Sequence, residues 1–303
     1  MEQTGTLDFA EAYRRMYLIR RVETEIARRY HPDPDNPGDS PMRCPVHLAD
    51  GAEALAVGVA MAVSADTHVW VTHRNHHVYL AFGGDLDAMV AELYGKATGC
   101  SGGWGGSMYL HDKAAGVMGG SAIVGSAVSM AVGSAWAAKL QGSERLTVAW
   151  AGDAVVETGQ FWEAWNFARL HELRLLFVIE NNEFSTATNR LQRHGMRPPA
   201  VSSVNGANGE AVFGRVAGIS AFPFLLWADV PRYREHVGPG FDDWREGERP
   251  DARGLYGYDD PLPQLARVIF ENMDSGVMAV IEPEINARVD EAFEKAEAAP
   301  WPE

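Results

Sequence analysis

The chain has 303 residues, of which 46% are hydrophobic, and this is enough to bury one large α/β core. Its formal net charge of −15 at pH 7 argues against nucleic acid or an anionic membrane surface as a partner. The two cysteines, Cys44 and Cys100, lack paired metal-ligand spacing, so they support neither a disulfide framework nor a zinc site.

The apolar runs and the start of the chain bear on its location. No apolar run reaches the length of a membrane span, and Met1 to Leu7 lacks the basic and apolar parts of a signal peptide. We therefore expect a cytoplasmic protein with no membrane partner. No internal repeat or domain boundary is evident, so residues 1–303 are predicted to form a single domain.

Four segments precede the central part of the chain. Residues 7–30 carry apolar side chains at nearly helical spacing and predict an amphipathic helix, and the prolines between His31 and Pro45 predict a loop. The glycine-rich run Gly99 to Ser107 is typical either of a close approach to phosphate or substrate or of a flexible connection. Residues 124–140, rich in Ala, Ser, Gly and Met, predict a buried helix that another helix can approach, which we expect to be a subunit interface.

Residues 145–179 predict a strand, a helix and a second strand. The apolar run Arg145 to Ala151 is typical of a buried parallel strand, and Gly152 after it permits a tight turn. Residues 158–171 suit a helix packed on the sheet, and Leu173 to Ile179 predicts the next strand. In open α/β sheets, ligands bind outside the carboxyl ends of the strands, so residues that follow these two strands are expected to meet at one rim.

Asp153 follows the first of these strands, and Asn182 follows the second. A carboxylate, an amide oxygen and a backbone carbonyl are hard ligands that suit a Mg²⁺ completed by water or phosphate oxygens. Taken singly, each residue is more typical of a helix cap or a turn. Together, at this spacing, they predict a metal-diphosphate site.

The Gly-Asp turn, the helix and strand, and Asn181-Asn182 together resemble the thiamine diphosphate motif of the α subunits of 2-oxo acid dehydrogenases of the pyruvate, branched-chain and acetoin types. Other segments resemble that family in the same order along the chain: 46–47, 51–54, 72–77, 99–103, 105–108 and 123–125. The resemblance runs from about Leu7 to Thr188 and resumes near Arg232. It implies an α/β, three-layer thiamine diphosphate-binding fold, with a parallel sheet flanked by helices.

The resemblance also implies which residues hold thiamine diphosphate and Mg²⁺. The metal ligands would be Asp153, Asn182 and the backbone carbonyl of Phe184. His73 and Arg74 would contact the diphosphate, for which a guanidinium fork is well suited. The other positions implied to bind cofactor are Ala122 and Val124, around the aminopyrimidine ring, then Gly152, Ala154 and Arg232. Ala154 stands where many relatives have glycine, but alanine can adopt the ordinary helical angles there.

Two histidines, His76 and His236, match family histidines that face the reacting carbon. A histidine can stabilise a developing alkoxide, move protons or position an acyl acceptor. The implied reaction is decarboxylation of a 2-oxo acid with transfer of the acyl unit to a lipoyl group. In this family the carboxylate that activates the cofactor comes from a β subunit. The resemblance therefore implies a β-subunit partner in an α2β2 assembly, with a lipoyl acyltransferase as a further partner.

One segment departs from the family. Between Phe213 and Arg232, roughly a helix and a strand are missing when the interval is compared with the usual size of a βα unit. The interval is either a true deletion or a place where residues are missing from the sequence. A true deletion would affect the last strand of the sheet, the placement of His236 and activity itself.

Other functions remain open. A transketolase-like or acyloin-forming carboligase would use the same cofactor to transfer a two-carbon unit from a 2-oxo acid or ketose, and the fold does not separate the two reactions. The short interval favours a third function, an inactive scaffold that binds a partner. A nicotinamide-binding fold is disfavoured because no G-x-G-x-x-G follows a suitable first strand.

The last part of the chain predicts loops and helices. Residues 189–208 and 231–258 resemble the active-site loops that order over the cofactor in this family. Residues 261–298 predict a C-terminal helical region.

Overall fold

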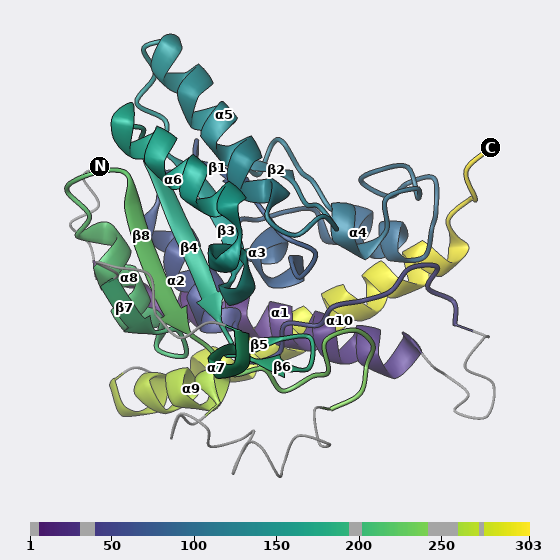
Figure 1. Ribbon diagram of the computed structural model, residues 1–303. Helices are drawn as coiled ribbons and strands as arrows, with labels where there is room; N and C mark the ends of the chain where they lie inside the picture. Colours follow the sequence, from purple (N-terminus) through teal and green to yellow (C-terminus); the bar gives the residue numbers. More distant parts are fainter. Residues whose placement is uncertain (1–5, 31–39, 194–201, 242–259, 273–275) are drawn as a thin grey trace.

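A single parallel sheet organises the chain (Figure 1). The computed structural model describes residues 6–30, 40–193, 202–241, 260–272 and 276–303. Within these ranges six strands form a sheet in the order β2-β1-β3-β4-β8-β7, and every neighbouring pair is parallel. Its strands are β1 His68–Trp70, β2 Val117–Gly119, β3 Thr147–Gly152, β4 Leu175–Asn181, β7 Ser202–Asn205 and β8 Phe224–Asp229. Two short strands, β5 Phe184–Ser185 and β6 Thr188–Asn189, form a separate antiparallel hairpin.

Helices cover both faces of the sheet, so the predicted three-layer α/β fold is confirmed. One face carries α5 Ser126–Leu140 and α6 Gly159–Leu170. The other face carries a larger group: α1 Phe9–Tyr30, α2 Glu53–Ala62, α3 His76–Ala81, α4 Leu86–Leu93, α8 Gly209–Ala217, α9 Pro261–Asn272 and α10 Gly276–Ala298. The shorter helices are η1 Ser107–Tyr109, η2 Asp153–Glu157 and α7 Arg190–Arg193.

The central strand β4 shows why these apolar runs form strands. Its side chains alternate between the two faces, as strand geometry requires. Leu176 and Val178 belong to the core on the α1 side, whereas Phe177 and Ile179 belong to the core beneath α5 and α6. Both faces are covered, so the strand is apolar at almost every position, which is the pattern that predicted it.

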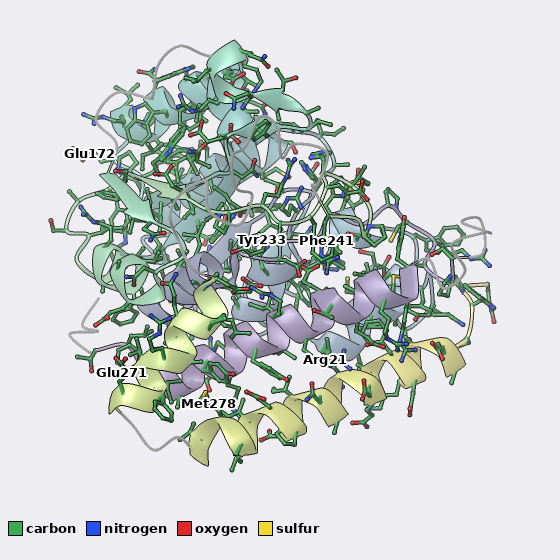
Figure 2. All side chains as sticks on the ribbon, turned by 90° about the horizontal axis from the view of Figure 1, so that it is seen from below. Arg21, Glu172, Tyr233, Phe241, Glu271 and Met278 are labelled. Carbon is green, nitrogen blue, oxygen red and sulfur yellow. The ribbon has the colours of Figure 1, made fainter. Side chains whose placement is uncertain are left out.

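The two ends of the chain pack against each other. Helix α1 lies beside α10, and the Tyr13 hydroxyl on α1 donates a 2.7 Å hydrogen bond to Glu282 on α10. Figure 2 shows the two helices side by side from below. The predicted N-terminal helix is confirmed, and α9 and α10 confirm the predicted C-terminal helices over their described residues.

The short interval between Phe213 and Arg232 leaves the sheet intact. Strand β8 pairs with β4 from Phe224 to Asp229, and its second half pairs with β7 on the other side. Helix α8 alone connects β7 to β8. The expected disturbance of the last strand is therefore wrong, because β7, α8 and β8 already make a complete βαβ unit.

Helix α5 is buried on the face that packs on the sheet, and its other face is exposed in the single chain, so its expected role as a subunit interface stays a prediction. Ala127, Ala131 and Ala135 face the sheet, whereas Ser129 and Gly133 on the opposite side are exposed. A side chain added at Gly133 would meet no atom within 4 Å. The small residues thus serve packing on the sheet and also leave a smooth outer surface.

The glycine-rich run 99–107 is organised by one buried carboxylate. Glu92 on α4 is 1% exposed, and its two oxygens accept four backbone N–H hydrogen bonds of 2.7–2.9 Å. The donors are Ser101 and Gly103 on Oε2, and Gly105 and Gly106 on Oε1. Gly103 and Gly106 have φ values of +82° and +64°, which favour glycine. These four amides are occupied by Glu92, so they do not serve as phosphate donors.

In the part of the chain that the structure describes, no helix is long and apolar enough to cross a membrane.

Candidate functional site

The carboxyl ends of the central strands form one rim. Gly152 at the end of β3 pairs with Glu180 on β4, and Asn181 at the end of β4 pairs with Asp229 on β8. The residues that follow these strands therefore leave the sheet at the same edge. Because of this register, the residues that follow two different strands come together at one edge of the sheet, as the fold class predicts.

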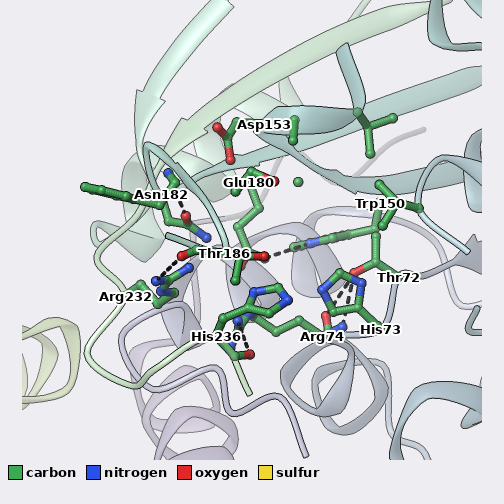
Figure 3. A pocket seen from close by; sticks show the side chains of 16 residues that line it. Thr72, His73, Arg74, Trp150, Asp153, Glu180, Asn182, Thr186, Arg232 and His236 are labelled. Atoms are coloured by element: carbon green, nitrogen blue, oxygen red, sulfur yellow. Dashed lines mark hydrogen bonds between the residues drawn. The ribbon is translucent and has the colours of Figure 1, made fainter. Parts of the chain in front are cut away.

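A cavity lies at this rim, and most of the predicted site residues line it (Figure 3). Figure 3 shows Asp153 and Asn182 at one end, with His73 and His236 at the other. The predicted residues that line the cavity are His73, Arg74, Val124, Gly152, Asp153, Ala154, Asn182, Phe184, Arg232 and His236.

Asp153 begins η2 and is only 2% exposed. Its Oδ2 lies 2.5 Å from the Nη2 of Arg193, and the other Nη of that guanidinium bonds to Glu157. Burial raises the pKa of the Asp153 carboxyl above its usual value, while Arg193 opposes the rise. A buried carboxylate needs a positive partner, and in this structure an arginine supplies the charge.

Asn182 and Phe184 line the same cavity as Asp153. The Oδ1 of Asn182 accepts a 3.1 Å hydrogen bond from the Phe184 N–H, which fixes the tight turn between β4 and β5. Gly152 is extended, with φ −77°, so the expectation that its glycine serves a tight turn is wrong. A Cβ at Gly152 would meet no atom within 4 Å, so glycine here keeps open the space of the cavity that it lines. Ala154 lies in η2, as its ordinary helical angles allow.

Three imidazoles form a cluster, and two of them, His73 and His236, line the other end of the cavity. His47, His73 and His236 have ring centroids 4.6, 5.2 and 5.4 Å apart, and the rings meet edge to face. Burial is the main cause that lowers their pKa values, to about 2 for His47 and about 4 for His73 and His236. The Arg74 charge adds to the effect in each case. The imidazoles are therefore neutral at pH 7, and their lone pairs are available to a hydrogen-bond donor or a metal.

Two arginines hold the loops around the cavity. The guanidinium of Arg74 donates to the Leu48 carbonyl and, at 3.0 Å, to the carbonyl of His236. Arg232 donates a 3.1 Å hydrogen bond to the carbonyl of Thr186. Both side chains are buried, and both line the cavity. The arginines thus tie the segment after β8 to the rest of the rim.

His76 and Ala122 are not brought into the cavity that the described residues form. His76 is 0% exposed, with its Nε2 2.7 Å from the Ser107 hydroxyl and its Nδ1 3.2 Å from Glu23 Oε1. Its position therefore does not support the predicted place facing the reacting carbon. His73 and Arg74 precede α3 and line the cavity. Helix α3 begins at His76, whose side chain is buried in the interior. Ala122 is half-buried and is not among the residues that line the cavity.

The sequence interpretation gave no role to Glu180, although it lies in the Glu-Asn-Asn motif. Glu180 lines the cavity and accepts 2.9 Å hydrogen bonds from His77 Nε2 and Trp150 Nε1. Burial opposes its ionisation, but the charge and hydrogen bond of His77, with the Trp150 hydrogen bond, hold the pKa of Glu180 below its usual value. The sequence does carry a signal for Glu180, because it is a carboxylate at the end of an otherwise apolar strand.

His47 and Arg193 were also missed. His47 was part of a recognised motif, but only the tertiary structure places it against His73 and His236. No local pattern marks Arg193. The predicted loops 189–208 and 231–258 are described only in part, because residues 194–201 and 242–259 lie outside the described ranges.

Residues 14–207 match the family model described as "Dehydrogenase E1 component". The chain belongs to this family.

Relatives of this E1 component chain match over most of its length. It is 34% identical over 274 residues to "Pyruvate dehydrogenase E1 component subunit alpha-1, mitochondrial" of Oryza sativa subsp. japonica, which covers 85% of this chain and 69% of the relative. "Pyruvate dehydrogenase E1 component subunit alpha" of Zymomonas mobilis subsp. mobilis is 33% identical, over 97% of this chain and 86% of the relative. The Rickettsia bellii subunit of the same name is 30% identical, over 97% and 93%.

The family assignment confirms the predicted resemblance. The chain is an E1 α subunit of the thiamine diphosphate-dependent 2-oxo acid dehydrogenases, the component that decarboxylates the 2-oxo acid. The family-model match includes Asp153, Asn182 and His73, whereas Arg232 and His236 lie beyond its end at residue 207.

Proposed function

We propose that this E1 α subunit acts on pyruvate or a 2-oxo acid of similar size, with thiamine diphosphate and Mg²⁺, in a complex with a β subunit and a lipoyl acyltransferase. The main observation behind this proposal is the cavity, which has oxygen ligands at one end and neutral histidines at the other. The relatives support the substrate, since they are named as pyruvate dehydrogenase subunits.

The residues at the metal end fit the proposed group. Asp153 and Asn182 supply side-chain oxygens and Phe184 a backbone carbonyl, a hard donor set that suits Mg²⁺. The buried Asp153 carboxylate already requires a cation, which Arg193 supplies in this structure. A divalent metal would replace that guanidinium and would hold the diphosphate through the phosphate oxygens.

The chemistry of the cofactor, when bound, is attack on the 2-oxo acid carbonyl and loss of carbon dioxide. This chain's own residues orient the substrate and donate hydrogen bonds to it. The neutral imidazoles of His73 and His236 line the cavity and can donate a hydrogen bond to an oxygen that becomes negative. Buried Arg74 fixes the backbone of His236, so that imidazole is held in position before substrate arrives.

The surface over α5 and α6 supports the proposal of a β partner. Small residues leave the outer side of α5 smooth, and large apolar side chains are exposed near it: Ile123, Val124, Leu140, Trp162 and Leu170. Val124 also lines the cavity although it is 52% exposed, so a partner seated there would close the site. In the described residues, no carboxylate in the cavity stands free for activating the cofactor, since Asp153 and Glu180 are both paired.

The matched relatives favour the dehydrogenase over the carboligase, and the intact sheet and cavity remove the main reason for an inactive scaffold. Purification of the tagged chain, with identification of co-purifying chains by mass spectrometry, tests the partners. A β-like chain with a lipoyl acyltransferase supports the proposal. A β-like chain without a lipoyl protein favours carboligation, and the absence of a β-like chain favours the scaffold.

Asp153→Ala tests the metal site. We expect at least tenfold weaker Mg²⁺-dependent binding of thiamine diphosphate by the assembled complex, measured by calorimetry, because one metal ligand is lost. Asp66→Ala is the control, since Asp66 is an exposed carboxylate that does not line the cavity. Unchanged cofactor affinity in a folded Asp153→Ala complex would refute the assignment.

A further inference from the structure

Three histidines from distant parts of the sequence form a cluster: His73 and His236 line the cavity, and His47 packs against both. His47 lies in a segment bridged to Gly238, His73 follows β1, and His236 follows β8. Each offers one ring nitrogen, and these three nitrogens all lie within 4.8 Å of one another. Figure 3 shows the rings of His73 and His236 facing the same space. The cluster is thus a converging set of nitrogen donors.

One donor in the cluster is unpaired. His47 is 6% exposed, and its Nδ1 has no hydrogen-bond partner among the residues that the structure describes. A buried polar atom without a partner is costly, so it indicates a missing ligand, ion or water. The low pKa values of the three imidazoles leave their lone pairs unprotonated at pH 7, as metal binding requires.

We infer that His47, His73 and His236 bind a single transition-metal dication of the Zn²⁺ class. Three imidazoles with a fourth, open position are a common zinc donor set. Zn–N bonds of about 2.0–2.1 Å place tetrahedral ligand nitrogens about 3.3 Å apart, so the rings close by up to about 1.5 Å, which side-chain rotation provides. The spacing of the two cysteines predicts no zinc site in this chain. The fold instead brings histidines from three separate segments together to form one.

Charged side chains around the cluster affect its affinity for a metal ion. Arg74 acts on all three imidazoles and disfavours an added cation. Glu180, a carboxylate on the same cavity wall, offsets that charge and acts on His73. The nitrogen donors also separate this site from the oxygen donors of Asp153 and Asn182, since imidazole suits Zn²⁺ and Mg²⁺ prefers oxygen. The cluster therefore discriminates between the two metals.

The inference has a functional consequence that goes beyond the proposed reaction. A metal on the three imidazoles occupies the groups that would face the substrate oxygen. Zn²⁺ is therefore expected to inhibit by competing with the 2-oxo acid, without displacing thiamine diphosphate from the Asp153 end. The metal site itself does not depend on the proposed function, because binding is measured without turnover.

The test is metal binding by the purified protein, with any subunits that accompany it, after chelator treatment and removal of the chelator. Zn²⁺ is titrated against a chromogenic zinc indicator in excess Mg²⁺. We expect one tightly bound Zn²⁺ per chain. His47→Gln and His236→Gln should each weaken binding at least tenfold, since even an outer partner of a metal ligand is worth about 10–100-fold. His171→Gln, which removes a histidine packed on Trp136, is the matched control.

Each outcome of the zinc titration either supports or overturns the proposed site. Loss of binding in both cluster variants but not in the control supports the site. No bound Zn²⁺, equal binding in all variants, or displacement by Mg²⁺ overturns it. If the variants do not fold, Co²⁺ binding by the wild-type protein decides: an intense visible spectrum of four-coordinate Co²⁺ supports the site, and the weak spectrum of six-coordinate Co²⁺ overturns it.

Discussion

The carboxylate of Glu92 provides the sharpest test of how this fold is held together. Its oxygens accept four backbone hydrogen bonds of 2.7–2.9 Å from the glycine-rich run 99–107, and the side chain is 1% exposed. In Glu92→Gln, one oxygen becomes an NH₂ group that faces two backbone donors. Those two donors then lose their acceptor, although the side chain keeps nearly the same volume.

The magnitude follows from the two lost bonds. A hydrogen bond to a charged group contributes about 1.5–3 kcal/mol, so the loss of two is expected to lower the free energy of unfolding by about 3 kcal/mol or more. The remaining two bonds also weaken because the acceptor is no longer charged. The carboxylate also lies against Gly99, where an added Cβ would come within 2.3 Å of Oε2, so the loop cannot simply shift inward.

The assay is chemical denaturation of the purified protein, followed by circular dichroism. Glu11→Gln is the matched control, because Glu11 forms a surface ion pair of 2.7 Å with Arg15 and is expected to change the free energy of unfolding by less than about 1 kcal/mol. If Glu92→Gln changes stability no more than Glu11→Gln does, the four hydrogen bonds do not hold the loop and the reasoning is refuted.

Two further predictions concern ion pairs. In Arg193→Met, no guanidinium competes for Asp153, so the proposed Mg²⁺ site should bind metal more tightly at a fixed concentration of thiamine diphosphate. The control is Arg190→Met, which loses only an ion pair with Glu183. Equal Mg²⁺ affinity in the two variants would contradict competition between Arg193 and the metal. In Glu25→Gln, the acid limb of the stability curve should flatten. Burial opposes ionisation, but hydrogen bonds from Arg28, Arg29 and Arg21 lower the pKa of Glu25 from 4.5 to about 2, so this carboxylate stabilises the fold above pH 4.5 and its contribution is lost as the pH falls towards 2. The difference in acid sensitivity is expected to be about 1–2 kcal/mol, since solvent screens the partly exposed arginines; it is measured as the free energy of unfolding between these pH values, and an unchanged pH dependence would contradict it.

Local patterns predicted much of the sheet and its helices. The apolar run before Asp153 and the run before Asn182 became β3 and β4, and the segment between them became α6. These elements depend on side-chain periodicity and on burial from both sides, which a short stretch of sequence already shows. The single domain, the cytoplasmic location and the individual catalytic roles stay predictions.

The points that the sequence did not decide have physical causes. Helix α5 is covered by the sheet on one face, and composition does not reveal whether a partner covers the other. His76 was expected in the active site from its motif; its side chain lies against Glu23 and Ser107 at the start of α3, and its catalytic role stays a prediction. The interval after Phe213 looked too short, but one helix suffices to bring β8 next to β4.

The sequence by itself determined the α/β class, the order of the strand-helix units and the pairing of Asp153 with Asn182, because parallel strands deliver their carboxyl ends to one rim. Only the tertiary structure decided the contacts between segments that are far apart in the chain. Arg193 on Asp153 and His47 beside His73 and His236 arise from loops that meet through packing. The side-chain periods that mark strands and helices carry no information about which loop side chains will touch.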